Sequence, residues 1–416
     1  MLVVQTLGSS KMSCFLCVIT ALVVVISTTI ALVSRKRDPE KIFGIYSRPG
    51  RWFYLKYYVF LALLYVRQFL SGLKKADTGL GSNVQIDYDH LDLWKPLSSD
   101  AKAFDAVFFQ AVNNKGYYLC GGVERRQLNK INGVFYIVVP ELGLLRSEHL
   151  PKTSLDATNS GEENAFEGGG IHLRMIEPMK KWKVSYKGNM WLDEKNNKID
   201  VDINAEWTSN YPHFFFDTGM DKGLIAEAIA REPWSKELFK NLKAAHQTHY
   251  EQMGYLNGTL KVNGKVHNLE MSSFRDHSFG NKRDWSLMHR YAFHMMYLDD
   301  STRICVGVVS QPCTTSHLAM GYIVTPKRKI HRITRCNLQL FEHGENGRPP
   351  KNIAFSITAN YMRYDCSVST LHECEHFKGN DVEARLLERF TVCRVNGTNG
   401  RGIAEWHYNN VKNAKE

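Results

Sequence analysis

Residues 273–285 read SFRDHSFGNKRDW and place two Arg-Asp pairs, a histidine and a tryptophan in one short segment. On a β-strand, alternate side chains face opposite sides, so Arg275 and His277 would face one side and Asp276 the other. Beside an apolar cavity, desolvation would raise the pKa of a carboxyl such as Asp276 and let it donate a proton at neutral pH. The alternative is an ion-pair corner that closes a barrel end, with Trp285 packed over a guanidinium. Both interpretations can hold together, because a structural arginine can position a catalytic carboxyl.

The chain around this segment is rich in short runs of β-branched and aromatic residues, and 12% of all residues are aromatic. Residues 199–207, IDVDINAEW, alternate apolar and polar side chains as a half-buried strand does. Residues 260–267, LKVNGKVH, predict a tight hairpin, because Asn263 and Gly264 tolerate the positive φ angles of its turn. Many strands joined by short turns predict an all-β sandwich or barrel.

One helical stretch, broken at Pro233, interrupts the strands, so we expect a helical linker at residues 216–250. We place a first barrel at residues 85–215 and a second at 251–410, after a membrane anchor region at 1–80. Two β blocks of similar size are consistent with a doubled barrel.

Residues 15–33 carry no charge and are followed by the basic residues 35–37. This length and these flanks predict a transmembrane helix, with a cleaved signal peptide as the alternative. Residues 52–70 are also apolar but contain one lysine and one arginine. That segment would cross the membrane, lie in its surface plane, or be a buried helix of the body.

We therefore expect a membrane protein, with a single-pass or hairpin anchor, in the endoplasmic reticulum. If only residues 15–33 span, the body is cytosolic; if 52–70 also span, it is luminal and the sequons at Asn257 and Asn396 are glycosylation candidates. The net charge of +11 comes without a nucleic-acid-binding motif, so we expect a membrane partner and no nucleic acid.

Nine cysteines are scattered along the chain. Residues 372–376, HECEH, offer metal-ligand types, but no second cluster of matching spacing completes a site. We therefore expect neither a metal ion nor another cofactor.

The segment RDHSFG at residues 275–280, followed by RDW at 283–285, resembles the RDHSWG-x-RDW signature of the AttH-like proteins. These are related to the hydroxyneurosporene synthase (carotenoid hydratase) group. Phe279 stands where Trp is usual, and the spacer 281–282 has one extra residue. The resemblance covers residues 87–407 and implies two lipocalin-like antiparallel β-barrels in one chain, here joined by the helical segment and preceded by the transmembrane helix. Other segments that fit the pattern are residues 178–188, 249–252, 321–322 and 400–406.

This resemblance leaves two functions open, because related barrels include hydratases, cyclases and lipid carriers. The first is an enzyme that hydrates, cyclises or isomerises an apolar, isoprenoid or polyketide-like molecule by acid catalysis. Asp276 would be its acid, His277 a proton relay and Arg275 a carboxylate holder. Glu405 is a second candidate acid, or an ion-paired strand residue. The expected catalytic residues are Asp276, His277, Arg275 and Glu405, and the expected substrate-binding residues are Arg283, Asp284, Trp285 and Trp182.

The second function is a non-catalytic lipid-binding or carrier protein. In either case the partner is a hydrophobic small molecule.

Overall fold

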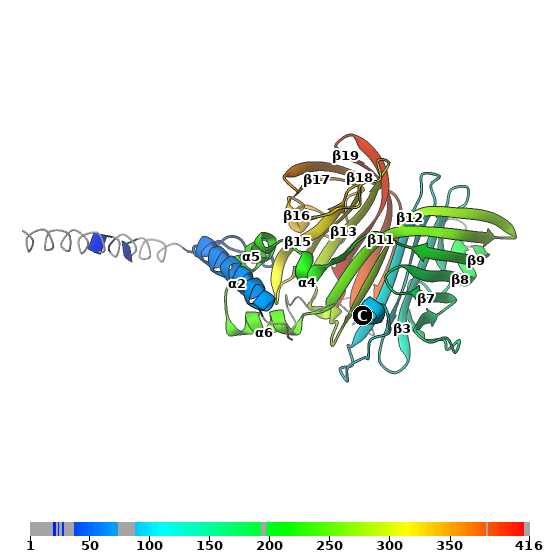
Figure 1. Ribbon diagram of the computed structural model, residues 1–416, viewed down its shortest axis with the longest axis horizontal. Helices are drawn as coiled ribbons and strands as arrows, with labels where there is room; N and C mark the ends of the chain where they lie inside the picture. The colour runs from blue at the N-terminus through cyan, green and yellow to red at the C-terminus, as the bar shows by residue number, and fades with distance from the viewer. Residues whose placement is uncertain are drawn as a thin grey trace, which may run out of the picture.

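The computed structural model describes residues 20, 21, 24, 27, 28, 37–73, 88–192, 197–379 and 382–411. Two β-barrels lie side by side, and a group of helices lies at one end of the molecule (Figure 1). Every pairing between named strands is antiparallel.

The first barrel is a closed ring because β9 pairs with both β8 and β11. In spatial order its strands are β11 (Thr248–Val262), β12 (Lys265–Gly280), β1 (Phe104–Val112), β2 (Tyr118–Arg125), β3 (Lys130–Val139), β4 (Gly143–Ser147), β8 (Lys181–Leu192) and β9 (Asn197–Thr208). Shorter strands at its edges are β5 (Ser154–Asp156), β6 (Ala165–Gly168), β7 (Ile171–Glu177) and β10 (His213–Phe215).

The second barrel is closed by the pairing of its first and last strands. Its strands follow chain order: β13 (Arg290–Leu298), β14 (Arg303–Gln311), β15 (Thr315–Val324), β16 (Ile330–Cys336), β17 (Asn352–Ala359), β18 (Met362–Lys378), β19 (Ala384–Val395) and β20 (Thr398–Asn409). The helical elements are α2 (Phe53–Leu73), α3 (Tyr88–Leu91), α4 (Phe216–Gly219), α5 (Lys222–Arg231), α6 (Lys236–Ala244), and the 3-10 turns η1 (Trp285–Leu287) and η2 (Leu340–Glu342).

The strand, the hairpin and the helical break that local sequence patterns predicted are all present in the structure. β9 alternates buried and more exposed residues over residues 199–207. The hairpin between β11 and β12 turns at Asn263 and Gly264, with φ angles of 47° and 82°. The helical stretch is broken around Pro233 into α5, capped by Asp221, and α6, capped by Ser235.

The predicted domain boundaries differ from the strand pairing. Strands β11 and β12, placed in the second barrel from the sequence, belong to the first, since β11 pairs with β9 and β12 with β1. The helices α4, α5 and α6 therefore interrupt the first barrel instead of joining two barrels, and the junction falls at residues 281–289. Pairing between strands so distant in the chain leaves no local signal.

The two barrels pack through their outer walls, which form an apolar cluster between the two barrel interiors. Several adjoining strands are consequently buried on both faces, among them β2 and β14. We call this contact the barrel interface. Its buried members include Tyr118, Cys120, Tyr136, Phe274, Tyr297, Tyr322, Phe390 and Ile403.

The predicted transmembrane segment 15–33 lies outside the described residues, apart from five scattered positions. In the part of the chain that the structure describes, no helix has both the length and the apolar character needed to cross a membrane. Residues 52–70 fall largely within α2, which packs against α5.

Candidate functional site

The alternation of β12 divides the charged segment between two environments. Arg275 and His277 point into the first barrel, where both are fully buried. Arg275 Nη1 donates to Asp92 Oδ1 at 2.5 Å, and the guanidinium lies 5.4 Å from the ring of Trp182. Trp182 Nε1 also donates to Asp92, at 3.1 Å. Arg275 and Trp182, both singled out in the sequence, therefore meet at Asp92, a carboxylate that the sequence analysis missed.

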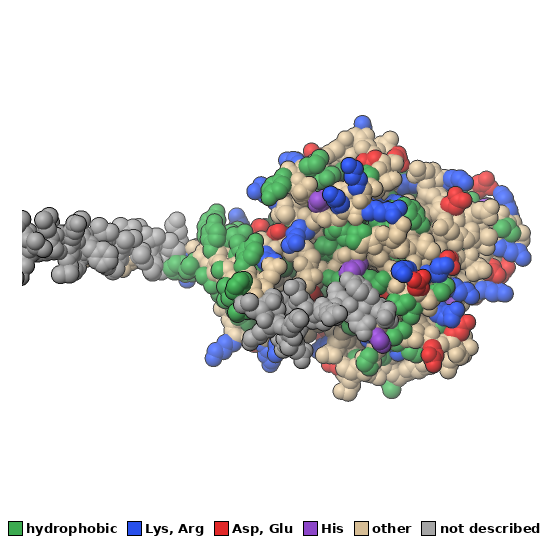
Figure 2. Space-filling model, in the orientation of Figure 1, with side chains coloured by type: hydrophobic (Ala, Val, Ile, Leu, Met, Phe, Trp, Pro, Cys, Tyr) green, Lys and Arg blue, Asp and Glu red, His purple; other side chains and the backbone are tan. Residues whose placement is uncertain are grey.

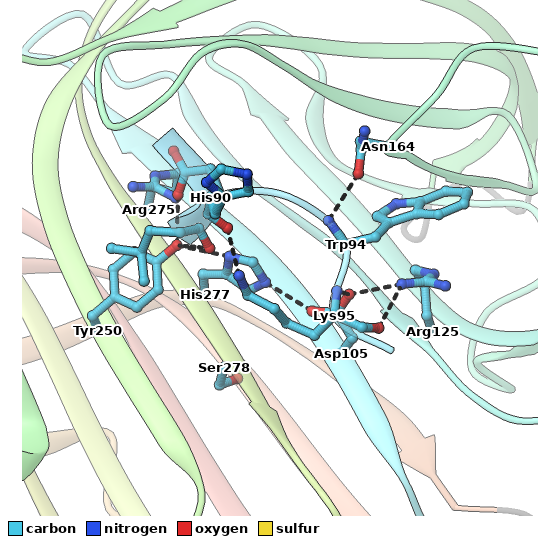
Figure 3. Close-up of polar contacts among 12 residues, drawn as sticks. His90, Trp94, Lys95, Asp105, Arg125, Asn164, Tyr250, Arg275, His277 and Ser278 are labelled. Carbon is cyan, nitrogen blue, oxygen red and sulfur yellow. Dashed lines mark hydrogen bonds and ion pairs between the residues drawn. The ribbon is translucent and has the colours of Figure 1, made fainter. Parts of the chain in front are cut away.

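The network continues from Asp92 through Tyr250 and His277 to Asp105 and Arg125; Figure 3 shows the last four. The hydroxyl of Tyr250 donates to Asp92 Oδ1 at 2.5 Å and lies 2.8 Å from Nδ1 of His277. Nε2 of His277 lies 2.8 Å from Oδ1 of Asp105, whose other oxygen accepts from Arg125 at 2.8 Å. Burial alone would raise the pKa of Asp92, but the charge of Arg275 lowers it below the usual value. Both carboxylates of this network, Asp92 and Asp105, are ion paired, as expected for a polar network with a structural role.

Asp276 points the other way, towards the second barrel, and meets His249 and Glu251 of β11. Nε2 of His249 lies 3.1 Å from Oδ2 of Asp276 and 3.3 Å from Oε1 of Glu251. Glu251 stands directly opposite Asp276 in the strand register, and His249 is two residues away on the same face. We call these three residues the acid-histidine cluster.

The electrostatics of the cluster reverse the proton position expected from the sequence. Burial by itself raises the pKa of Asp276, but the charge of His249 lowers it below the usual value. Burial lowers the pKa of His249, whereas Asp276 and then Glu251 raise it to about 10. Asp276 is therefore a carboxylate at neutral pH, and His249 carries the proton.

The ring of Phe216 in α4 stacks on the imidazole of His249, with ring centroids 4.2 Å apart and planes 2° apart. This contact keeps the imidazole in position and excludes water from one of its faces. Among the described residues, the acid-histidine cluster is also the set whose potential metal-ligating atoms lie within 4.8 Å of one another. A metal ion there would first have to displace the proton that two carboxylates stabilise on His249.

Several buried polar atoms around the cluster have no hydrogen-bond partner in the described part of the chain. They are His249 Nε2, which lies within ion-pair distance of both carboxylates but outside hydrogen-bond geometry, Glu251 Oε2, Asp276 Oδ1, both amide atoms of Gln110 and the hydroxyls of Tyr297 and Tyr322. An unpaired buried polar atom costs roughly 1–3 kcal/mol, so a native protein retains a group of them only with a compensating advantage. The two tyrosines come from the second barrel, so both barrels contribute to this site.

A second carboxylate pair lies in the barrel interface and includes the predicted residue Glu405. The hydroxyl of Tyr291 donates to Glu405 Oε1 at 2.5 Å, and Glu388 stands opposite Glu405 in the β19–β20 register. Glu388 is fully buried. Burial first, and the charge of Glu405 second, raise its pKa well above the usual value. Glu388 is thus a buried neutral acid, which the sequence analysis did not single out.

The remaining predicted residues form a corner between the barrels. Arg283 Nη1 lies 2.8 Å from Glu124 Oε2, and its guanidinium lies 5.6 Å from the ring of Trp285. Asp284 pairs with Lys102 at 2.6 Å and accepts a hydrogen bond at the start of η1. These contacts are of the kind considered as the structural alternative, and the expected role of Arg283, Asp284 and Trp285 in substrate binding stays a prediction.

Two adjoining grooves open along the rim of the barrel interface. One has a volume of about 470 Å³ and includes Asn114 of the first barrel and Arg401 of the second. The other, of about 300 Å³, includes Tyr297 and Arg303. Tyr297 therefore links the rim to the neighbourhood of the acid-histidine cluster.

Comparisons with solved structures support the double-barrel fold and extend no further than the fold. No curated protein matches the sequence. A protein from Nitrosomonas europaea assigned as an AttH has a TM-score of 0.52 at 9% identity, over 80% of this chain and 98% of its own. This likeness shows a shared fold and supports the AttH-like resemblance at that level.

Two further solved structures are more distant. Kievitone hydratase from Nectria haematococca has a TM-score of 0.49 at 12% identity, over 80% of this chain and 97% of its own. CghA, solved with Sch210972, has a TM-score of 0.45 at 7% identity, over 74% and 88%. The model of a family described as "Family of unknown function (DUF8627)" matches residues 17–408.

Proposed function

Because the chain belongs to DUF8627, a family of unknown function, we propose its activity from its own residues: proton-transfer catalysis on an apolar small molecule between the barrels. The reaction class is isomerisation, cyclisation or hydration. The substrate class that fits best is polyketide-like, with a carbonyl group conjugated to the reacting carbons.

The acid strength of His249 decides which class of substrate it could act on. His249, with a pKa of about 10, is too weak an acid to protonate an isolated double bond of an isoprenoid. It is well suited to donate a hydrogen bond or a proton to a carbonyl oxygen that becomes an enolate. Asp276 or Glu251, as carboxylates, would remove a proton from the neighbouring carbon.

In these roles the protons and electrons of the reaction balance without a cofactor. The carboxylate takes a proton from carbon, His249 stabilises the enolate oxygen, and the proton returns to a different carbon in an isomerisation. In a cyclisation, the enolate carbon would add to a second carbon-carbon double bond of the same molecule that is conjugated to a carbonyl group. The π bond of that acceptor breaks, and the carboxylate returns its proton to the other carbon of the acceptor. In a hydration, the carboxylate would take a proton from one bound water, whose oxygen adds to the conjugated double bond, and would return that proton to the neighbouring carbon. The aromatic side chains of the barrel interface would keep bulk water away from these steps.

The observation that carries the proposal is the acid-histidine cluster itself. A protonated histidine stands between two carboxylates, in a buried place where Asp276 Oδ1 and Glu251 Oε2 lack partners. Perturbed, incompletely paired titratable groups between two domains are typical of functional sites. The Arg275 network, by contrast, pairs its carboxylates and has a sufficient structural explanation.

The alternative is a non-catalytic carrier of an apolar molecule. The aromatic lining of the barrel interface favours this function, since it would receive such a ligand without any chemistry. The acid-histidine cluster would then serve only to orient a polar end of the ligand.

Two conservative variants separate these functions. Small molecules that co-purify with the full chain would be identified by mass spectrometry, and then incubated with wild-type protein, Asp276→Asn and His249→Gln. Catalysis predicts that conversion is lost in both variants while ligand binding remains. Conversion that persists in both variants would contradict the assignment, and binding without conversion in any form would favour the carrier.

We also propose that residues 15–33 anchor the chain in the endoplasmic reticulum membrane. Their uncharged sequence and the basic residues 35–37 that follow support this. An anchor would bring the protein to the place where apolar substrates dissolve.

A further inference from the structure

Helix α2 exposes an apolar surface on the outside of the molecule. Its 21 residues include Tyr54, Leu63 and Phe69, which are 73%, 55% and 69% exposed. The exposed large hydrophobic side chains of this helix are Tyr54, Leu55, Tyr58, Val59, Leu63, Tyr65, Val66, Phe69 and Leu70. Proteins seldom expose so many neighbouring apolar side chains unless the surface binds something.

The opposite face of α2 is fixed to the body. Phe60 lies 6.2 Å from Trp234 and 6.5 Å from Phe239, measured between ring centroids. Lys56 Nζ donates to the backbone oxygen of Glu232 at 2.7 Å. The helix is therefore apolar on both faces: one packs against protein and the other is uncovered.

A turn before α2 adds another exposed aromatic side chain. Phe43 is 64% exposed and has a φ of 53°, a left-handed conformation that a bulky residue adopts at a cost. The bridge between Ile42 and Tyr46 closes this turn, and the hydroxyl of Tyr46 donates to Glu345 at 2.7 Å. The fold thus holds a phenyl ring outward at the tip of a rigid turn.

Basic side chains flank the apolar surface. Lys236, Lys240 and Lys243 are exposed on one side of α6, where Phe239 is 41% exposed. Figure 2 shows apolar side chains gathered over α2 and Lys or Arg side chains below them, at the α6 end. Aromatic and aliphatic side chains beside lysines are the composition of a surface that rests on anionic lipid.

The chain itself argues for lipid as the occupant. The uncharged residues 15–33 lie shortly before α2, with the basic residues 35–37 between them. A segment of that kind in a bilayer would hold the next part of the chain at the bilayer surface. A second protein would have no such reason to be near this face.

We propose that α2 and Phe43 lie in the interfacial plane of the membrane, with the α6 lysines against anionic headgroups. Helix α5 joins this surface to the site, because it packs on both α2 and β15, the strand of Tyr322. The inference rests on the proposed anchoring by residues 15–33 and is independent of the proposed chemistry.

The test uses the full chain in phosphatidylcholine vesicles, with and without phosphatidylserine, that contain a phospholipid with a photoactivatable acyl chain. Mass spectrometry would locate the lipid adducts. We expect adducts on α2, at Leu63, Val66 or Phe69, and on Phe43. Val266 and Tyr361, exposed by 60% and 100% on the barrels, are the matched controls and should carry none.

Substitutions in α2 and α6 test whether the adducts depend on the apolar side chains and on the lysines. The double change Leu63→Glu and Phe69→Glu should remove the α2 adducts and leave the thermal unfolding temperature unchanged, whereas Val266→Glu should change neither. Replacing the three α6 lysines by Glu should abolish the increase that phosphatidylserine causes. Adducts confined to residues 15–33 would overturn the inference but leave the anchor intact, and absence of adducts from both segments would overturn both. Crosslinks from α2 to a second protein chain would also overturn it.

Discussion

Asp276 and its neighbours Arg275 and His277 show how one residue of offset on a strand changes the chemistry of a side chain. Arg275 and His277 enter a network that pairs two carboxylates, whereas Asp276 joins a cluster with unpartnered oxygens. The face of β12 that a side chain occupies therefore decides whether it joins the paired network or the acid-histidine cluster.

The pKa of His249 gives a prediction about stability. Its folded value of about 10 lies above the ordinary 6.5, so its contribution is complete below pH 6.5 and is lost as pH rises towards 10. The free energy of unfolding of wild-type protein, minus that of His249→Gln, should fall over this range by up to about 1.4 kcal/mol per pH unit. Urea unfolding at a series of pH values measures it; a difference independent of pH would contradict the ion pair.

The buried pair of Arg275 and Asp92 gives a second prediction. Removing one member leaves an uncompensated buried charge, so Arg275→Met should lower the free energy of unfolding by about 3–5 kcal/mol. Arg363→Met, which breaks a pair whose side chains are 68% and 63% exposed, is the control and should cost under about 0.5 kcal/mol. Chemical denaturation compares the two, and equal losses would refute the structural role of the pair.

Strands β19 and β20 bring Glu388 and Glu405 opposite each other on the wall of the second barrel that the first barrel covers. A carboxyl in such a place stays neutral because burial and the charge of Glu405 raise its pKa by more than the charge of Lys378 lowers it. The register of two strands, and not either residue by itself, creates this acid.

The raised pKa of Glu388 predicts how the stability of the protein depends on pH. Glu388 has a folded pKa above the ordinary 4.5, so stability should decrease as pH rises above that value. In Glu388→Gln this loss, about 1.4 kcal/mol per pH unit at most, should be absent, and the variant should be the more stable protein at pH 7. Glu141→Gln, at a side chain 77% exposed, is the control for thermal unfolding measured from pH 4 to 8. A Glu388→Gln variant that keeps the slope would contradict a neutral Glu388.

The apolar barrel interface joins two rings of strands that are each closed by their own hydrogen bonds. Among the described residues, backbone bridging between the rings is confined to Lys152 and Phe377, so we expect side-chain packing to supply most of the energy that holds them together. Sites between the barrels depend on this packing.

This coupling can be tested at Phe390, a fully buried residue of the interface. Phe390→Ala should cost about 3–5 kcal/mol and separate one calorimetric unfolding transition into two, because the barrels lose part of their contact. Leu371→Ala, at a side chain 48% exposed on β18, is the control and should leave one transition. A single transition in Phe390→Ala, merely shifted in temperature, would show that the barrels unfold as one unit regardless of this residue.

Local patterns in the sequence determined the all-β class, the hairpin at Asn263-Gly264, the helices on either side of Pro233 and the opposite directions of Arg275 and Asp276. Each of these depends on residues close together in the chain, whose dihedral preferences and alternation act before any tertiary contact forms. Only the tertiary structure decided that β11 and β12 close the first barrel, that Asp92 pairs with Arg275, and that His249 takes the proton from Asp276. Those outcomes depend on pairing, burial and charge between segments far apart in the chain, and a pKa is set by such surroundings and not by the residue that carries it.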